Sequence, residues 1–312
     1  MKEFFSLIAG DLKLVKNQID AQLACPDKQI QSMISYIAPE NGKFLRPAVF
    51  LLSNLCFAKN ENLQINVASV LEMIHLATLL HDDVIDNAQQ RRGKTTVNTI
   101  DGNERAVLLG DYVLAHALKL SNELNRNDIQ NELASMTTKI CLGELSQNLN
   151  RGNYQLTEEQ YIDIITQKTA SFFASSCKLA AIINDSGESV PGSLESFGMN
   201  LGIAFQIRDD IIDIVGSEAE IGKTLGTDLQ KSKMTLPTIH FLQKSPNRKQ
   251  EIIENFNSIP AVKTLLKSTQ SIDYSKDRLT DYCQLAIKSL SGIPSCPAKD
   301  GLIKVTNSIA NF

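Results

Sequence analysis

Apolar residues recur every three or four positions through most of this chain, which is the spacing of an amphipathic α-helix. Alternating β-branched runs flanked by hairpin dipeptides, which would indicate strands, are scarce. The pattern therefore predicts an all-α fold. The expected helices cover residues 2–24, 28–37, 46–58, 64–88, 103–123, 128–150, 158–185, 192–215, 235–244, 247–256, 260–268, 273–290 and 298–310.

The polar, glycine-containing stretches 89–102 and 216–234 interrupt this series. Neither is long enough, or rich enough in proline and serine, to be a linker between domains. We therefore expect one helical domain over residues 1–312. A capping box marks one helix start, because Thr157 can cap the helix while Gln160, three residues later, bonds back to it.

Composition narrows the class of protein. With 43% hydrophobic residues, the 312-residue chain can bury a substantial core. Its net charge of −4 gives no long-range field that attracts nucleic acid, so we expect no nucleic-acid partner. The six cysteines form no Cys-x-x-Cys pair and lie mostly in apolar stretches, which predicts buried thiols in a reducing compartment and no disulfides. They are Cys25, Cys56, Cys141, Cys177, Cys283 and Cys296.

The N-terminal segment gives no targeting signal. Glu3 and Asp11 bracket its short apolar patch, and no small-residue cleavage site follows, so a signal peptide is not expected. No run reaches the roughly 18 uninterrupted apolar residues that a spanning helix needs. We expect a soluble, cytoplasmic protein with no transmembrane segment.

Two acidic pentads, DDVID at 82–86 and DDIID at 209–213, each end a strongly apolar helix. At helical spacing the first and last aspartates of a pentad lie one above the other on one face, about 6 Å apart. Such carboxylates repel each other unless a cation lies between them. One pentad of this kind is more often a solvated helix face, but two of them favour a metal site.

Two such faces pointing at each other would form an all-oxygen pocket for a hard divalent ion. Mg²⁺ takes one or two carboxylates and fills its other positions with water and substrate phosphates. Arg91 and Arg92 follow the first pentad, and Lys223 follows the second. Arginine binds phosphate bidentately and lysine acts as a point charge. A metal-bridged diphosphate with an apolar tail accounts for charges of both signs beside apolar helices.

Several motifs, in a fixed order over residues 40–240, resemble those of the trans-type polyprenyl diphosphate synthases, most of all the octaprenyl-like medium- and long-chain members. No single motif would suffice. They are NGKFLRP (41–47), EMIHLATLLHDDVIDNAQQRRGKTTVN (72–98), LLGDYVLA (108–115), GELSQ (143–147), KTASFF (168–173), FQIRDDIID (205–213) and GKTLGTDLQKSKMTLP (222–237).

The resemblance implies the isoprenoid synthase fold, with mostly antiparallel helices around a central cavity, and a homodimer. It also implies prenyl transfer. An allylic diphosphate ionises, the double bond of isopentenyl diphosphate attacks the cation, and loss of a proton leaves a chain one isoprene unit longer. Contact with a membrane would be transient, for product release.

The resemblance further implies roles for individual residues. Asp82 and Asp86 would bind two Mg²⁺ ions on the allylic diphosphate and Asp209 a third. The remaining pentad carboxylates, Asp83, Asp210 and Asp213, would either lie behind the metal ligands or complete the pocket. The allylic diphosphate would be held by Arg91, Lys168 and Lys223, with Lys233 in support. Isopentenyl diphosphate would be held by Lys43, Arg46, His75 and Arg92.

Thr169 and Gln206 resemble the neutral dipoles that face the carbocation in this family. They could equally be polar groups in helix packing, as His75 could be an ordinary core histidine. Two positions depart from the family pattern. Asn41 stands where glycine is frequent, and Ser232 stands where glycine usually precedes Lys233, which bears on how that loop closes.

Product length in this family depends on what blocks the tail below the first pentad. Ala77 and Thr78, five and four residues before Asp82, are small, whereas short-chain members tend to carry an aromatic residue there. Met73 and Val70 continue the stripe without a ring. We therefore expect a medium- or long-chain synthase, of the kind that makes quinone side chains, with Met136 as a candidate floor of the tunnel.

Three alternatives remain open. One is a short-chain farnesyl or geranylgeranyl diphosphate synthase. Another is an HD-type metal phosphohydrolase, because His75 and the pair His81-Asp82 superficially resemble its ligands, although this leaves the second pentad unexplained. The third is a non-catalytic subunit of a heteromeric synthase, although such subunits usually lose aspartates that this chain keeps.

Overall fold

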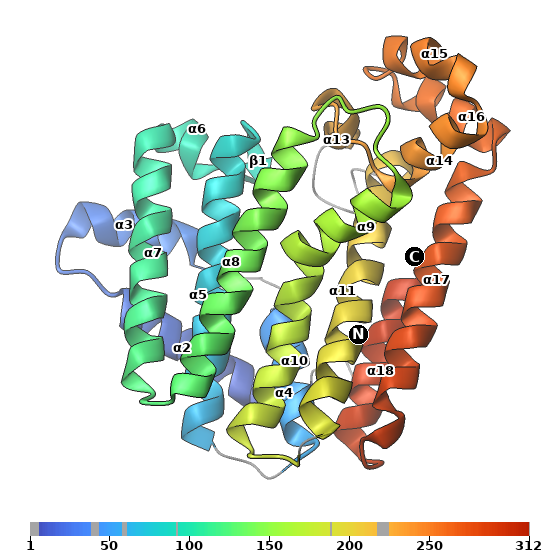
Figure 1. The fold of residues 1–312 in the computed structure, drawn as a ribbon. Helices are drawn as coiled ribbons and strands as arrows, with labels where there is room; N and C mark the ends of the chain where they lie inside the picture. Colours follow the sequence, from blue (N-terminus) through green and yellow to red (C-terminus); the bar gives the residue numbers. More distant parts are fainter. Residues whose placement is uncertain are drawn as a thin grey trace. The chain divides into compact units, whose positions relative to one another are not determined.

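The computed structural model describes residues 6–38, 44–57, 61–91, 93–187, 189–216 and 225–311, without the side chains of Glu61, Asn62 and Ser189. Regular structure in these ranges is almost entirely helical, which confirms the all-α prediction (Figure 1). The chain forms two compact units. The first comprises Met1–Ser135, Ser175–Glu195 and Gly292–Val305; the second comprises Met136–Ala174, Ser196–Ser291 and Thr306–Phe312. A single domain over the whole chain stays a prediction.

The first unit is built around one long apolar helix. Its own elements are α2 (Ala9–Leu23), α3 (Lys28–Ile37), α4 (Leu45–Leu55), α5 (Glu61–Ile85), β1 (Gln90–Arg91), β2 (Lys94–Thr95), α6 (Val97–Asp101) and α7 (Asn103–Glu123). Helix α5 packs against α2, α4 and α7, and α7 lies beside it in Figure 1.

The apolar character of α5 follows from this central position. Its segment Leu63–Ile85 is long and apolar enough by composition to cross a membrane, and 72% of its most apolar window is buried inside the protein, as in a core helix. Met73 and Ile74 are 0% and 1% exposed. Burial of each such side chain contributes about 1.5–3 kcal/mol.

A further set of elements lies wholly within the second unit. They are α9 (Glu158–Ile165), the π-helix η1 (Thr166–Ala170), α13 (Thr227–Gln230), α14 (Leu236–Lys244), the 3-10 turn η2 (Pro246–Arg248), α15 (Lys249–Glu254), α16 (Ile259–Ser268) and α17 (Ser271–Ser289). The elements α8 (Asn127–Leu149), α10 (Ser171–Ile183), α11 (Ser189–Val215), η3 (Leu290–Gly292) and α18 (Pro297–Ala310) have residues in both units.

Within the second unit, η1 packs closely on α11. A Cβ atom added at Gly202 of α11 would lie 2.5 Å from the Cα of Ala170, so only glycine permits this approach. The capping box at the start of α9 is confirmed: the Gln160 amide donates to Thr157 Oγ1 at 3.2 Å, and the Thr157 amide donates to Gln160 Oε1 at 3.0 Å.

Three sequence expectations were wrong in detail. The helix expected over 158–185 is interrupted by the π-helical turn η1 and ends at Ile183. The stretch 89–102 carries the two-stranded ribbon β1–β2 and the helix α6, and 216–234 carries α13. Not all cysteines are buried either: Cys177 and Cys283 are, Cys25, Cys56 and Cys296 are half-buried, and Cys141 on α8 is exposed.

Candidate functional site

The first pentad occupies the end of α5. The Asp86 amide donates to the Asp82 carbonyl at 2.8 Å, so helical spacing stacks these two residues. Asn87, in the left-handed conformation with φ 48°, then ends the helix, and the Ala88 amide donates back to the Asp83 carbonyl at 2.9 Å. This is a Schellman-type cap, which asparagine tolerates better than most residues. Asp82 and Asp86 remain half-buried, whereas Asp83 is buried.

One face of α5 is half-buried while its neighbours are largely buried, and this face changes character along its length. The residues, at helical spacing, are His75, Leu76, Thr78, Leu79, Asp82 and Asp86. Leu76 and Leu79 lie in the N-terminal part of this stripe, and the carboxylates of Asp82 and Asp86 lie at its C-terminal end. A ligand lying along this face would meet apolar surface first and negative charge last.

Basic side chains are tied to this region by two contacts. Arg91 Nε donates to Asp83 Oδ1 at 2.7 Å, so the buried carboxylate orients the guanidinium. Arg46 Nη1 lies 3.0 Å from His75 Nε2, which brings together two of the residues expected to bind isopentenyl diphosphate. The expected residues Lys43, Arg92 and Lys223, and also Asn41, lie outside the described residues.

His81 belongs to a different contact. Its Nε2 atom lies 3.3 Å from the Val107 carbonyl oxygen and 3.3 Å from Asp111 Oδ1, both on α7. His75 instead contacts Arg46. The two histidines therefore serve separate contacts, which gives no support to the HD-type alternative.

The second pentad ends α11 and divides its three carboxylates between surface and interior. Asp209 is half-buried, whereas Asp210 and Asp213 are 4% and 1% exposed. Asp213 accepts hydrogen bonds from the Asp228 amide at 3.2 Å and from Thr227 Oγ1 at 3.4 Å. It therefore holds the start of α13, and Asp209 is the only one of the three that is half-buried rather than buried.

The π-helix η1 carries two expected site residues, Lys168 and Thr169. π-Helical turns are rare and are often found at functional sites. Lys168 Nζ donates to Gln147 Oε1 at 2.7 Å and forms an ion pair with Glu144, both on α8. A Cβ atom at Gly143, on the same helix, would lie 2.2 Å from the Lys168 backbone nitrogen. Glycine at this position therefore allows α8 to approach η1.

Thr169 begins a chain of hydrogen bonds within the second unit. Thr169 Oγ1 donates to Gln206 Oε1 at 2.8 Å, and Gln206 Nε2 donates to Asp210 Oδ1 at 2.8 Å. Tyr161 Oη donates to Asp210 Oδ2 at 2.6 Å. The two residues expected to face the carbocation are thus in contact with each other.

Burial and neighbouring charges shift the pKa values of the two titratable groups in this chain, Asp210 and Tyr161. Burial raises the pKa of the Asp210 carboxyl well above its usual value, and the hydrogen bonds from Tyr161 and Gln206 oppose that rise. Burial, followed by the neighbouring Asp210 charge, raises the pKa of Tyr161 far above 10, so the phenol keeps its proton and acts as a donor.

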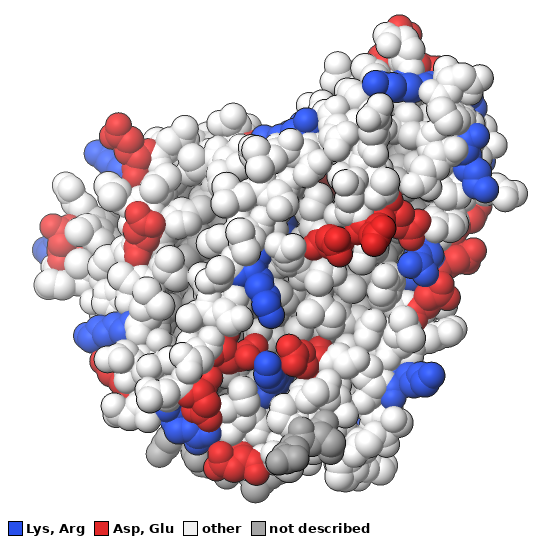
Figure 2. Space-filling view, in the orientation of Figure 1, with Lys and Arg blue, Asp and Glu red and all other residues white. Residues whose placement is uncertain are grey.

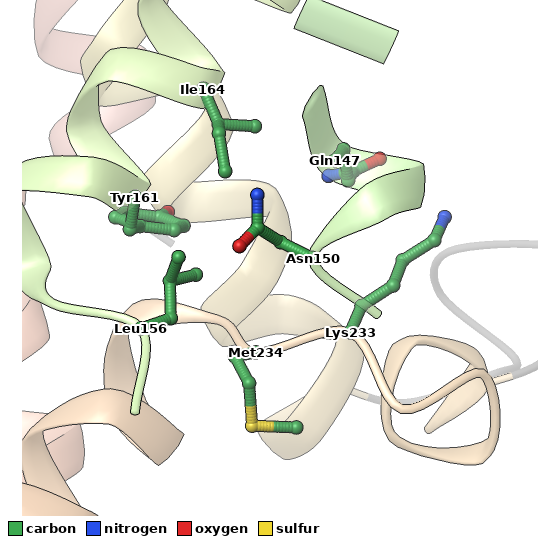
Figure 3. Close-up of a pocket in the computed structure, with 7 residues that line it drawn as sticks. All are labelled: Gln147, Asn150, Leu156, Tyr161, Ile164, Lys233 and Met234. Atoms are coloured by element: carbon green, nitrogen blue, oxygen red, sulfur yellow. The ribbon is translucent and has the colours of Figure 1, made fainter. Parts of the chain in front are cut away.

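A small pocket borders the Tyr161 ring in the same unit. Its volume is about 20 Å³, enough for an ordered water and too small for a prenyl chain. In Figure 3 Lys233 extends from the loop before α14, and the side chain of Asn150 lies between Lys233 and Tyr161. The lining residues are Gln147, Asn150, Leu156, Tyr161, Ile164, Lys233 and Met234.

The loop that carries Lys233 has a strained residue where the family pattern has glycine. Ser232 adopts φ 54°, in the left-handed region that glycine favours. Its carbonyl accepts a hydrogen bond from the Gly152 amide at 2.8 Å. Lys233 is 8% exposed and lies 3.8 Å from Asp228 Oδ1. The departure at Ser232 is therefore accommodated with backbone strain.

The expected chain-length residues do not share one environment. Met73, Ala77 and Val70 are buried, at 0%, 2% and 1% exposure, and Met136 is also buried. Thr78 lies on the half-buried stripe, where its hydroxyl donates to the His75 carbonyl at 2.8 Å. Any side chain enlarged at Ala77 must therefore displace packed neighbours.

The donor set fits a hard divalent ion shared with a ligand. Within the described ranges, no group of three or more His, Cys, Asp or Glu side chains could hold a metal ion by itself. The accessible pentad carboxylates are oxygen donors that need further ligands. Mg²⁺ commonly takes those ligands from water and phosphate.

Two residues of this site were not foreseen from the sequence. Glu144 pairs with Lys168, and Tyr161 bonds to Asp210. Glu144 lies inside the GELSQ stretch, but no pattern marked it as a partner of Lys168. Tyr161 carries no sequence signal, since a lone tyrosine on an amphipathic helix is usually a core residue.

On the face drawn in Figure 2, acidic and basic side chains are interspersed and most of the surface is uncharged.

Comparison with known proteins gives consistent matches over the whole chain. The family model described as polyprenyl synthetase matches residues 27–271. The octaprenyl diphosphate synthase of Escherichia coli (strain K12) is 30% identical over 97% of this chain and 96% of its own length. The heptaprenyl diphosphate synthase component 2 of Bacillus subtilis (strain 168) is 32% identical over 99% of this chain and 90% of its own length.

A solved structure agrees with the fold. The polyprenyl synthase from Caulobacter crescentus CB15, in complex with calcium and isoprenyl diphosphate, matches with a TM-score of 0.94 and 28% sequence identity. The match covers 99% of this chain and 97% of that one. That protein therefore combines this fold with bound calcium and isoprenyl diphosphate.

Proposed function

This chain belongs to the polyprenyl synthetase family, and on that premise we propose that it condenses isopentenyl diphosphate with an allylic diphosphate. Successive head-to-tail additions give a medium- or long-chain all-trans polyprenyl diphosphate. The relatives that make octaprenyl and heptaprenyl products support this product class.

The stripe along α5 is the observation that carries the proposal. Leu76 and Leu79 are half-buried apolar side chains, and the same face ends in Asp82 and Asp86. A prenyl diphosphate has the matching polarity, with an apolar tail and a charged head. The stripe is thus complementary to the substrate along its length.

Divalent metal dependence is expected for this family, and the carboxylates fit it. We propose that Asp82 and Asp86 would hold two Mg²⁺ ions on the allylic diphosphate and that Asp209 would hold a third. When bound, Mg²⁺ neutralises the negative charge that grows on the departing diphosphate. Asp83 contributes indirectly, because its buried carboxylate holds the Arg91 guanidinium at 2.7 Å.

Cationic side chains then bind and orient the two diphosphates. The allylic diphosphate is held by Arg91, Lys168, Lys223 and Lys233, and isopentenyl diphosphate by Lys43, Arg46, His75 and Arg92. In the absence of substrate Lys168 pairs with Glu144 and Gln147. Binding of a diphosphate exchanges one of these partners for a phosphate oxygen, which keeps the ammonium paired throughout.

Thr169 and Gln206 stabilise the allylic cation without capturing it. Their oxygens are neutral, and preoriented dipoles of this kind lower a barrier most where charge develops. Ala77, Thr78 and Met73 permit a long product, because none of them has a ring that would block the growing tail.

A subunit role is a second candidate, because one relative is named as component 2 of a heptaprenyl diphosphate synthase. In that case the purified chain would be inactive alone and active with a partner chain. Retention of all six pentad aspartates favours a chain that is itself catalytic.

We further propose that the protein acts as a homodimer in the cytoplasm, with transient membrane contact during product release. An apolar stripe on α8 supports self-association, since Leu142, Leu145 and Leu149 are 50%, 61% and 83% exposed. Six free thiols fit a reducing compartment. A charged substitution, Leu145→Glu, should produce monomers in sedimentation velocity experiments.

Release of pyrophosphate tests the catalytic proposal. With Mg²⁺ and an allylic diphosphate, release should depend on isopentenyl diphosphate. Release of similar size without isopentenyl diphosphate would identify a hydrolase. Activity that appears only after a second chain is added would identify a subunit of a heteromeric enzyme.

A further inference from the structure

A buried tyrosine lies at one end of the hydrogen-bond chain that reaches Thr169. Tyr161 is 3% exposed and donates to Asp210, which is 4% exposed. Asp210 in turn accepts from the Gln206 amide nitrogen. Tyr161 lies on α9 and Thr169 on η1, so both flank the same part of α11.

The direction of these hydrogen bonds determines which atom of the Gln206 amide faces Thr169. Because Gln206 Nε2 donates to Asp210, the amide oxygen Oε1 is turned toward Thr169. The Thr169 hydroxyl then gives its single proton to that oxygen. Its lone pairs are therefore left for another positive group. An inverted Gln206 amide would present N–H groups to Thr169 and reverse the hydroxyl dipole.

We propose that Tyr161 is a positioning residue for prenyl transfer: it holds Asp210, and through Asp210 it fixes the Gln206 amide so that Thr169 presents its oxygen to the cation. This inference rests on the proposed function, because it assigns Tyr161 a task in that reaction. Tyr161 itself need not touch either substrate.

The local packing explains why the anchor is needed. Gln206 is half-buried and its side chain has several rotatable bonds, so one hydrogen bond to Thr169 would not hold it. Asp210 has one oxygen for Gln206 and one for Tyr161. Removal of the Tyr161 hydroxyl leaves Oδ2 without that donor, so the buried carboxylate loses the contact that fixes its rotation.

The first pentad uses its second aspartate in the same way. Asp83 is buried and holds Arg91, as Asp210 is buried and holds Gln206. In both pentads the second carboxylate therefore orients a side chain expected to act on the substrate. The additional anchor at Asp210 is Tyr161.

The test compares Tyr161→Phe with Tyr274→Phe. Tyr274 on α17 also donates to a carboxylate of α9, Glu158, at 2.5 Å, but it is not part of the chain to Thr169. Both variants lose one tyrosine–carboxylate hydrogen bond in the same unit. Tyr161→Phe should lower the single-turnover condensation rate about ten-fold with both KM values within about two-fold of wild type. Tyr274→Phe should keep the wild-type rate.

A double-mutant cycle identifies the route of the effect. In a Gln206→Leu background, Tyr161→Phe should cause little further loss, because the group that it positions is already absent. A full additional ten-fold loss there would show that Tyr161 acts elsewhere. A raised KM with an unchanged rate, or a lower Tm with an unchanged rate, would overturn the proposal.

Crystal structures of the wild type and Tyr161→Phe provide a readout that is independent of activity. The hydrogen bond from Thr169 Oγ1 to Gln206 Oε1, 2.8 Å long in the wild type, should be absent from the variant. If Gln206 keeps its place, the inference fails even when the wild type is an active synthase. If the wild type makes no condensation product while Gln206 does move, the proposed function fails and the positioning of Gln206 stands.

Discussion

Gly143→Ala should displace the π-helix that carries Lys168 and Thr169. The added Cβ would lie 2.2 Å from the Lys168 backbone nitrogen and 2.6 Å from its Cα, whereas ordinary contacts begin at 3.4 Å. The nitrogen must therefore move by at least 0.8 Å, from 2.2 Å to the 3.0 Å below which such contacts essentially never occur, and by 1.2 Å to reach an ordinary contact at 3.4 Å. The nitrogen and the Cα of Lys168 are both backbone atoms, so rotation of a side chain cannot relieve the contact.

This displacement is large for a catalytic site. A misplacement of about 1 Å can lower an enzymatic rate by about 100-fold. The same overpacking should cost about 1–3 kcal/mol of folding free energy. We expect kcat to fall about 100-fold while the protein still folds, with Tm lower by several degrees.

The assay is steady-state condensation with both substrates, together with thermal unfolding. Gly192→Ala is the matched control, because Gly192 is also helical and a Cβ there meets nothing within 4 Å. It should keep kcat and keep or slightly raise Tm, because alanine favours the helix more than glycine does. If Gly143→Ala had a kcat within about three-fold of wild type, the close approach of α8 would not position the site residues.

Substitutions at three further positions test the metal, chain-length and loop assignments. Asp82→Ala should lower activity by orders of magnitude with circular dichroism unchanged, and retained activity would contradict its assignment as a metal ligand. Ala77→Phe should shorten the product markedly on thin-layer chromatography, at a cost of about 1–3 kcal/mol in stability, and an unchanged product distribution would remove the tunnel argument. Because Ser232 has φ 54°, Ser232→Gly should keep or raise Tm. Ser232→Val should lower the free energy of unfolding by about 1 kcal/mol or more, and with it Tm. Equal Tm values would show that this backbone conformation carries no strain.

The long helices were predictable because burial on one face leaves a periodic apolar pattern. The expected helix 64–88 corresponds to α5, Glu61–Ile85, and 192–215 corresponds to α11, Ser189–Val215. Helix ends were less predictable, since α5 ends through the left-handed backbone at Asn87. The π-helix η1 was not foreseen, because a five-residue change of hydrogen bonding does not alter an apolar pattern enough to be recognised.

The candidate site was predictable in residue type and less so in arrangement. Carboxylate spacing at helical period marked both pentads, but burial of Asp210 and Asp213 depends on packing from distant segments. The same holds for Tyr161, whose partner is 49 residues away in the chain. Pairing over such distances leaves no local signal, whereas the polarity change along α5 is a local one.

Sizing the products of the purified chain shows whether the protein extends prenyl chains and how far. The protein would be incubated with Mg²⁺, labelled isopentenyl diphosphate and each of geranyl, farnesyl and geranylgeranyl diphosphate, and the dephosphorylated products separated by length. We expect all-trans chains longer than geranylgeranyl, formed only when metal and both substrates are present. Products no longer than geranylgeranyl would contradict the medium- or long-chain assignment, and phosphate release without chain growth would contradict prenyl transfer itself.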